Sequence, residues 1–221
     1  MKNRAVITLA IILLVNFTTG CKKSNDTKPK DYALSVKDKT WWGVVTYTGK
    51  PAEFYSVHFN TGNTFTWSQF SGDYNGQWVI SGNELKMTFD ENATEIKATI
   101  SDSDSLINIK ENSGILVINT CQLIANPNIA LDNSEWKGVF VTGFAYALDI
   151  NFRAPLKADI RQGLTYTNNI YTRTSSGAVI RTDINPVGST ASTHFFAIII
   201  SGSEMRGSIK NANVQWKASK Q

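Results

Sequence analysis

The chain has 221 residues, a formal net charge of +4 and 42% hydrophobic residues. Lys2 and Arg4 carry two of the positive charges, and residues 21–39 hold six lysines against three aspartates, so the rest of the chain is close to neutral. The basic balance therefore belongs to the N-terminal segment. No nucleic acid partner is expected, because binding nucleic acid needs a basic patch on the folded surface.

The first 20 residues are typical of a bacterial signal peptide. Lys2 and Arg4 precede an apolar run of 11 residues, Ala5–Val15, which is too short to span a bilayer. This segment, with the small residues before Cys21, resembles a lipoprotein signal, in which the cysteine becomes the new N-terminus and is lipid-modified. Thr18 stands where that pattern usually has leucine. The alternative is an ordinary secretory signal followed by an incidental cysteine.

Residues 21–37 are predicted to form a flexible, lipidated tether. The stretch is polar, contains Pro29 and has no apolar periodicity. Because more than one acyl chain gives stable attachment, the resemblance implies a protein anchored to the membrane through Cys21 without spanning it. Lys22 after the cysteine resembles lipoproteins sorted to the outer membrane. We therefore expect a cell-envelope location at the outer membrane, on either its periplasmic or its surface face.

Residues 38–124 are predicted to form a first β-barrel. In Glu53–Phe59 and Glu84–Phe89, apolar residues alternate with polar ones, which is the pattern of half-buried strands. Runs of Gly, Asn, Asp and Ser separate about eight such segments and suit hairpin turns. An open meander of this size would leave two exposed edges, so closure into a barrel is favoured.

Residues 133–221, after a connector at 125–132, repeat this plan. A Trp-x-Gly opening at Trp136 corresponds to one at Trp41, and the offset between corresponding residues drifts only from 93 to 99. A chance echo is the alternative, because identity between the two segments is low. The predicted fold class is all-β, with two tandem small antiparallel meander β-barrels after the signal peptide and linker. Trp41 and Trp136 are expected to be buried and equivalent.

One predicted strand, 195–200, is apolar on both faces. If its first, third and fifth residues face the core, then Phe196, Ile198 and Ile200 face outward. An exposed apolar stripe marks an interface. Two occupants fit it: the first barrel, or a partner protein.

The order of motifs in the first segment resembles the small lipocalin-like domains of Gram-negative envelope lipoproteins. The residues that carry the resemblance are Trp41-x-Gly43, Val57-x-Phe59, Gly76-x-Trp78 and Gly82-Asn83-x-Leu85. The second segment resembles them more weakly, since it lacks the tryptophan of the fourth strand. True lipocalins carry Gly-x-Trp in the first strand, and the order is reversed here. The resemblance thus implies a barrel but transfers no ligand-binding residues.

The sequence holds no catalytic or metal-binding motif. HExxH, CxxC, GxSxG and phosphate-binding glycine loops are absent, so no catalytic residue, metal or cofactor is predicted. Residues 101–105 alternate Ser and Asp but lack the later ligands of a calcium loop, which favours a hairpin turn. With Cys21 modified, Cys121 has no disulfide partner. It lies in a strand-like run and is interpreted as a small buried hydrophobe rather than a catalytic thiol.

Aromatic residues gather in the first four strands of the first segment, where Trp42, Tyr47, Trp67 and Trp78 are candidate ligand-binding residues. An eight-stranded barrel has room for its own side chains or for one small ligand, so core packing is the alternative role. Trp42 is expected to face outward, and the second segment has Lys137 at that place.

Together these features predict a non-enzymatic, lipid-anchored envelope protein that binds a small apolar or glycan ligand or a protein partner. The first alternative is an envelope interaction, inhibitor or accessory structural protein that uses the apolar stripe. The second is a hydrolase with a cryptic carboxylate pair, which the sequence alone cannot place in space.

Overall fold

The computed structural model of the protein describes residues 30–142, 147–184, 192–209 and 214–221. Residues Tyr32–Gln221 form one compact unit. It contains two eight-stranded antiparallel meander barrels, one nearly closed and one closed, which confirms the predicted fold class. The signal peptide, Cys21 and most of the predicted tether lie outside the described residues.

Barrel 1 is built from the first eight strands in the spatial order β7-β6-β5-β4-β3-β2-β1-β8, so β7 and β8 are its two edges. A short helix, α2 (Tyr32–Val36), precedes it. The strands are β1 (Lys39–Tyr47), β2 (Ala52–Phe59), β3 (Thr64–Gln69), β4 (Gly72–Ser81), β5 (Glu84–Phe89), β6 (Glu95–Ile100), β7 (Leu106–Glu111) and β8 (Leu116–Ile124).

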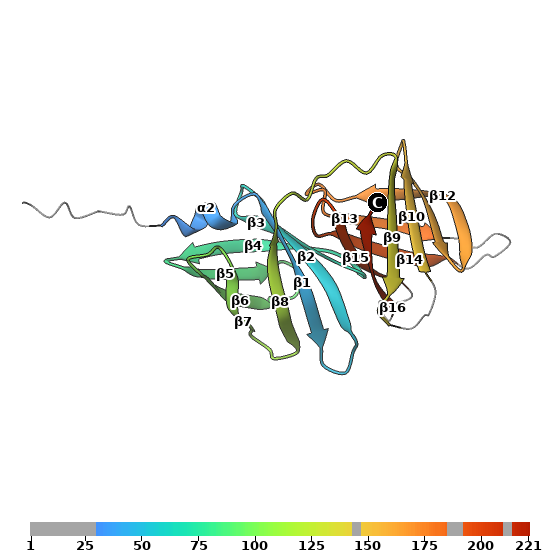
Figure 1. Ribbon diagram of the computed structural model, residues 1–221. Coiled ribbons are helices and arrows are strands. Elements are labelled where there is room, and N and C mark those ends of the chain that lie inside the picture. The colour runs from blue at the N-terminus through green and yellow to red at the C-terminus, as the bar shows by residue number, and fades with distance from the viewer. Residues whose placement is uncertain (1–29, 143–146, 185–191, 210–213) are drawn as a thin grey trace, which may run out of the picture. The chain divides into compact units, whose positions relative to one another are not determined.

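Barrel 2 closes completely, because β16 pairs with β9. Its strands are β9 (Ser134–Phe140), β10 (Ala147–Arg153), β11 (Lys157–Gln162), β12 (Leu164–Arg173), β13 (Val179–Ile184), β14 (Thr193–Ile199), β15 (Glu204–Ile209) and β16 (Val214–Lys220). Both meanders are visible in Figure 1.

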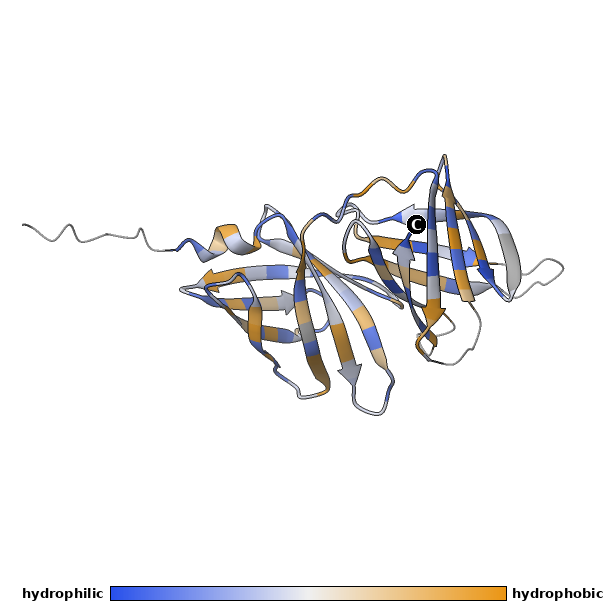
Figure 2. Cartoon of the chain, in the orientation of Figure 1, coloured by the Kyte–Doolittle hydropathy of each residue, from blue (hydrophilic) through white to orange (hydrophobic). Residues whose placement is uncertain are grey.

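The alternating sequence pattern decides which side chains fill each barrel. Figure 2 shows hydrophobic and hydrophilic residues alternating along the strands, as period-two side-chain geometry requires. The two opening tryptophans are 1% and 0% exposed, as expected. Trp41 pairs with Val57 on the next strand and Trp136 pairs with Ile150, so the first two strands of both barrels meet in the same register.

One end of barrel 1 is closed by α2 and by packed aromatic rings. Val36 at the end of α2 is fully buried in the barrel-1 core. Phe59 meets Trp41 and Trp78 edge-on, with ring centroids 5.3 and 5.9 Å apart. The helix lies inside the segment 21–37 that we predicted as tether; a helix of five residues is too short to show a 3.6-residue period.

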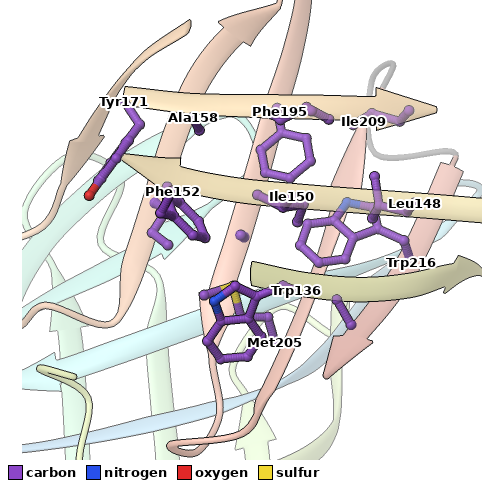
Figure 3. Packing of buried hydrophobic residues seen from close by; sticks show 14 of the residues in the cluster. Trp136, Leu148, Ile150, Phe152, Ala158, Tyr171, Phe195, Met205, Ile209 and Trp216 are labelled. Atoms are coloured by element: carbon purple, nitrogen blue, oxygen red, sulfur yellow. The ribbon is translucent and has the colours of Figure 1, made fainter. Parts of the chain in front are cut away.

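The interior of barrel 2 is filled by large side chains. Figure 3 shows Trp136, Met205 and Trp216 among them, and all three are fully buried. Phe195 and Trp216 stack with their ring centroids 5.0 Å apart. Gly207 lies beside the Trp216 ring, where an added Cβ would come within 2.3 Å of it. The absence of a side chain there lets the indole pack against the strand.

The two barrels share a third group of buried apolar side chains, which we call the interbarrel cluster. Its members are Trp42, Phe54 and Ile124 from barrel 1 and Ala178, Val179, Phe196 and Ile198 from barrel 2, with Val44, Phe70 and Ile200 partly buried against them. Phe196 and Ile198 are fully buried. Of the two occupants predicted for the apolar stripe, the structure therefore places barrel 1 on it.

Candidate ligand-binding site

A cavity of about 440 Å³ opens at the mouth of barrel 1. In a meander, alternate hairpins lie at the same end, and the cavity is lined from the hairpins that follow β1, β3, β5 and β7. In Figure 1, α2 lies at the end of the barrel away from the β1–β2 hairpin. The barrel is thus closed at the α2 end, by that helix and the packed aromatic rings, and open at the end of the β1–β2 hairpin. The volume is in the range of about 300–1,000 Å³ that is typical of small-molecule sites.

Four aromatic side chains, Tyr47, Trp67, Tyr74 and Phe89, contribute to the cavity wall. The Trp67 ring is held in place from two sides. Tyr55 stacks on it with a centroid distance of 4.0 Å, and Phe89 meets it edge-on at 5.8 Å. This arrangement offers apolar ring surface to a ligand.

Gln69 organises the polar groups of the wall. Its side-chain oxygen accepts hydrogen bonds from the Tyr47 hydroxyl at 2.8 Å and from the Trp67 indole at 3.0 Å. Its amide nitrogen donates to Ser71 at 3.0 Å, and Ser71 is 3.0 Å from the Tyr74 hydroxyl. Because the carbonyl oxygen is occupied by two donors, the orientation of the amide is fixed. Gln69 is 6% exposed, so it is a buried polar group with partners.

Glu53 is the unusual residue of the site. It shares the inward parity of Tyr55 on β2 and lines the cavity. One carboxylate oxygen, Oε2, is buried and has no hydrogen-bond partner among the described residues. Burial raises the pKa of Glu53, and the neighbouring charge of Lys50 opposes this rise. Since a buried acceptor without a partner destabilises the fold, this arrangement needs an explanation.

Glu111 also lines the cavity but is committed to its own hairpin. Its oxygens accept from the Ser113 amide and hydroxyl at 2.9 and 2.8 Å and from the Ile115 and Leu116 amides at 3.2 and 3.4 Å. Burial alone would raise the pKa of Glu111, but these donors outweigh it and hold the pKa below its usual value. Glu111 thus fixes the β7–β8 turn.

Barrel 2 holds two of the hairpins that line the cavity. Arg181 on β13 donates to the main-chain oxygens of Gln69 and Gly72 at 2.9 and 3.1 Å, which bracket the β3–β4 turn. Gln215 on β16 donates to the main-chain oxygen of Ala52 at 2.6 Å, at the end of the β1–β2 hairpin. The mouth of barrel 1 is therefore anchored from outside.

Of the four predicted ligand-binding residues, Tyr47 and Trp67 line the cavity. Trp78 lies in the packed end of the barrel, is 3% exposed, and donates from its indole to the Thr64 carbonyl at 3.0 Å. Trp42 faces away from barrel 1, as expected, but it is only 5% exposed because barrel 2 covers it. The guanidinium of Arg206 lies 5.0 Å from its ring centroid. Neither Trp42 nor Trp78 lines the cavity.

Sequence reasoning missed Glu53 and Gln69. Both signals were present: each residue continues the inward parity of an alternating strand with a polar side chain. A polar group at an inward position requires a partner or a ligand.

The remaining candidates for chemistry are dispersed. Cys121, which was expected to be buried, is only partly buried against the core of barrel 1. Burial of its thiol still raises the pKa to about 12, so it is protonated at neutral pH and a poor nucleophile. His58 is bonded to Thr40 at 2.9 Å, and His194 to Asp183 at 2.7 Å. In the part of the chain that the structure describes, no three or more His, Cys, Asp and Glu side chains gather as a metal ion would require. Within the described ranges, no helix has the length and apolar character needed to cross a membrane.

The fold and the cavity define a pair of tandem antiparallel barrels, of which the first has an open mouth. No protein-family description and no curated protein matches the chain. A solved structure of a DUF3598-family protein of unknown function from Nostoc punctiforme PCC 73102 is similar at 10% identity, with a TM-score of 0.25. That similarity covers 86% of this chain and 97% of the other.

Proposed function

We propose that the protein is a lipid-anchored lipoprotein of the cell envelope, with two lipocalin-like barrels, and that barrel 1 binds a small ligand without transforming it. The observation that carries the binding proposal is the cavity of about 440 Å³, walled by aromatic rings and by a fixed set of polar groups. The membrane anchor would be Cys21. The lipoprotein-like signal supports this, with its apolar run Ala5–Val15 followed by the small residues Thr18, Thr19 and Gly20 before that cysteine.

Binding is tested by native mass spectrometry of the protein purified from its own cells, followed by identification of any released molecule. Trp67→Ala changes the cavity wall, whereas Trp136→Ala changes only the core of barrel 2 and controls for loss of stability. We expect an adduct on the wild type and on Trp136→Ala, but not on Trp67→Ala. Absence of any adduct, together with no response of tryptophan fluorescence to a small-molecule panel, would count against a binding function.

Anchoring is tested by labelling cells with a palmitate analogue and fractionating their membranes. The wild type should carry the label and sediment with the outer membrane, and Cys21→Ser should do neither. A labelled Cys21→Ser protein would refute the assignment of the anchor.

A hydrolase is the second candidate, because Glu53 and Glu111 both line the cavity and their pKa values move in opposite directions. Two carboxyl groups whose pKa values are moved apart can act as a general acid and a general base. Against it, both oxygens of Glu111 already accept hydrogen bonds from its own hairpin. Turnover of nitrophenyl glycosides or esters that Glu53→Gln and Glu111→Gln both abolish would establish this function instead.

The alternative function, in which the apolar stripe on β14 binds a partner protein, loses its main support, because Phe196 and Ile198 are buried against barrel 1.

A further inference from the structure

Among the described residues that line the cavity, one acceptor has no partner and one hydroxyl hydrogen is left over. The acceptor is Glu53 Oε2, which is buried and has no partner among the described residues. The donor belongs to Ser71 and Tyr74. Their two hydroxyls carry two hydrogens, and the 3.0 Å bond between them uses one. Gln69 also donates to Ser71, so it takes up none of these hydrogens. One hydroxyl hydrogen is therefore left for a ligand, whether Ser71 or Tyr74 donates in the bond between them.

The two unused groups lie near each other at the mouth. Glu53, Ser71 and Tyr74 line the same cavity. Tyr47 is joined to the Ser71–Tyr74 pair through Gln69, by hydrogen bonds of 2.8 and 3.0 Å. A small ligand that contacts Tyr47 is therefore within reach of an acceptor on β2 and a donor on the β3–β4 hairpin. A hydroxyl group is the simplest partner for both, since it can donate one hydrogen bond and accept two.

The charges of the cavity disfavour an anionic amphiphile. Glu53 and Glu111 line it, against Lys50 as the one basic side chain among its lining residues. Lys50 is engaged with the Tyr47 ring, with its ammonium 5.9 Å from the centroid. A fatty-acid carboxylate would thus meet two carboxylates, and like charges brought together weaken binding. The packed rings around Phe59 also close the barrel beneath the cavity, where an acyl chain would have to extend.

We propose that the cavity of barrel 1 binds an uncharged, hydroxyl-bearing ring, that is, a saccharide unit, whose hydroxyls donate to Glu53 and accept from the Ser71–Tyr74 pair. The inference rests on the proposed ligand-binding function and specifies its ligand class. The C–H faces of such a ring would contact the aromatic wall that includes Tyr47 and Phe89. Glu53 lines the cavity with a carboxylate that can accept a ligand hydroxyl.

The experiment titrates the folded, lipid-free chain with glucose, galactose, mannose and N-acetylglucosamine and with their β1,4-linked disaccharides, followed by saturation-transfer NMR and calorimetry. Separate arms use palmitate and the apolar dye N-phenylnaphthylamine. Glu53→Leu removes the acceptor and should weaken saccharide binding about 10- to 100-fold, as loss of a hydrogen bond to a charged group does. Tyr74→Phe shortens the hydroxyl chain and should weaken it about 2- to 10-fold.

Matched controls lie at the closed end of the same barrel. Glu84→Leu is made at an exposed carboxylate, and Tyr32→Phe removes a hydroxyl that donates to Asp102. Neither should change saccharide affinity. Glu53→Leu should also raise the melting temperature, because it removes a buried acceptor without a partner. Weaker binding by a more stable variant cannot be attributed to misfolding.

Each outcome decides a separate point. Saccharide binding that falls with Glu53→Leu and Tyr74→Phe, but not with the controls, supports the inference. Binding of palmitate or the dye that Trp67→Ala reduces, with no saccharide binding, overturns the ligand class while keeping the proposed function. Saccharide binding that is unchanged in Glu53→Leu also overturns it. No binding of any probe contradicts both proposals.

Discussion

Replacing Arg181 should loosen the mouth of barrel 1, although the residue belongs to barrel 2. One guanidinium nitrogen donates to the Gln69 and Gly72 carbonyls and to an Asp73 carboxylate oxygen at 2.8 Å. The guanidinium also lies 5.4 Å from the centroid of the Phe196 ring. Arg181→Ala leaves the two carbonyls at the β3–β4 turn without their donor and removes packing from the interbarrel cluster.

The magnitude depends on which acceptors matter. The Asp73 side chain is 40% exposed, so its ion pair with Arg181 is worth at most about 1 kcal/mol. The carbonyls accept from a charged donor whose side chain is only 17% exposed, and such hydrogen bonds contribute about 1.5–3 kcal/mol each. Because one nitrogen has two hydrogens for three acceptors, we expect Arg181→Ala to cost about 2–4 kcal/mol in total. For a chain of this size that lowers the melting temperature by about 4–16 °C.

Urea unfolding at neutral pH, followed by tryptophan fluorescence, measures this cost. Arg181→Lys should fall between the wild type and Arg181→Ala, because an ammonium keeps the charge but not the planar fork. Asp73→Asn should cost less than about 1 kcal/mol. If Asp73→Asn destabilises as much as Arg181→Ala, the ion pair dominates and the reasoning is wrong. If Arg181→Ala unfolds at the same urea concentration as the wild type, barrel 2 does not hold the β3–β4 hairpin.

Three further predictions follow from other residues. Because burial raises the folded-state pKa of Glu53, the folded state binds more protons than the unfolded state above about pH 4.3. The free energy of unfolding of the wild type, measured by urea unfolding, should therefore fall relative to that of Glu53→Gln as the pH rises from about 4.3 through the raised pKa, and then level off. A difference between the two proteins that stays constant over this pH range would contradict the prediction. In Cys21→Ser protein, Cys121 should react with a thiol reagent at neutral pH only on unfolding, since its pKa is raised to about 12; rapid labelling of the folded protein would refute this. Gly207→Ala places a Cβ 2.1 Å from the Phe196 carbonyl and should cost about 1–3 kcal/mol in thermal unfolding, whereas a neutral effect would show that the strand can shift.

Strand positions could be predicted because many strands of these barrels, such as β5 and β10, turn one face to the core and the other toward solvent. Period-two alternation in Glu53–Phe59 and Glu84–Phe89 corresponds to β2 and β5 in the structure. The Trp-x-Gly opening marked equivalent strands because the tryptophan fills the barrel interior in both copies. Helix α2 gave no such signal, since a helical period cannot be recognised in five residues.

The site could be predicted only in part, because it depends on which hairpins converge. Tyr47 was identified from the sequence as a candidate ligand-binding aromatic residue, but its hydrogen-bond partner Gln69 lies 22 residues away on another strand. Trp42 shows the limit most clearly. The prediction that its side chain points away from the interior of barrel 1 was correct. The side chain is nevertheless buried, because it packs in the interbarrel cluster. No pattern within one segment reports which surfaces of two domains will meet.

The doubly apolar strand β14 gains a physical explanation from these contacts. Phe195 and Ile199 fill barrel 2, while Phe196 and Ile198 fill the interbarrel cluster, so the strand serves two cores. The adjacent strand β13 carries Arg181, which points from the same face to the β3–β4 hairpin. Burying that apolar face brings the donor to the carbonyls that it holds. Barrel 2 therefore contributes to the site through its outer surface, while its interior is filled by its own side chains.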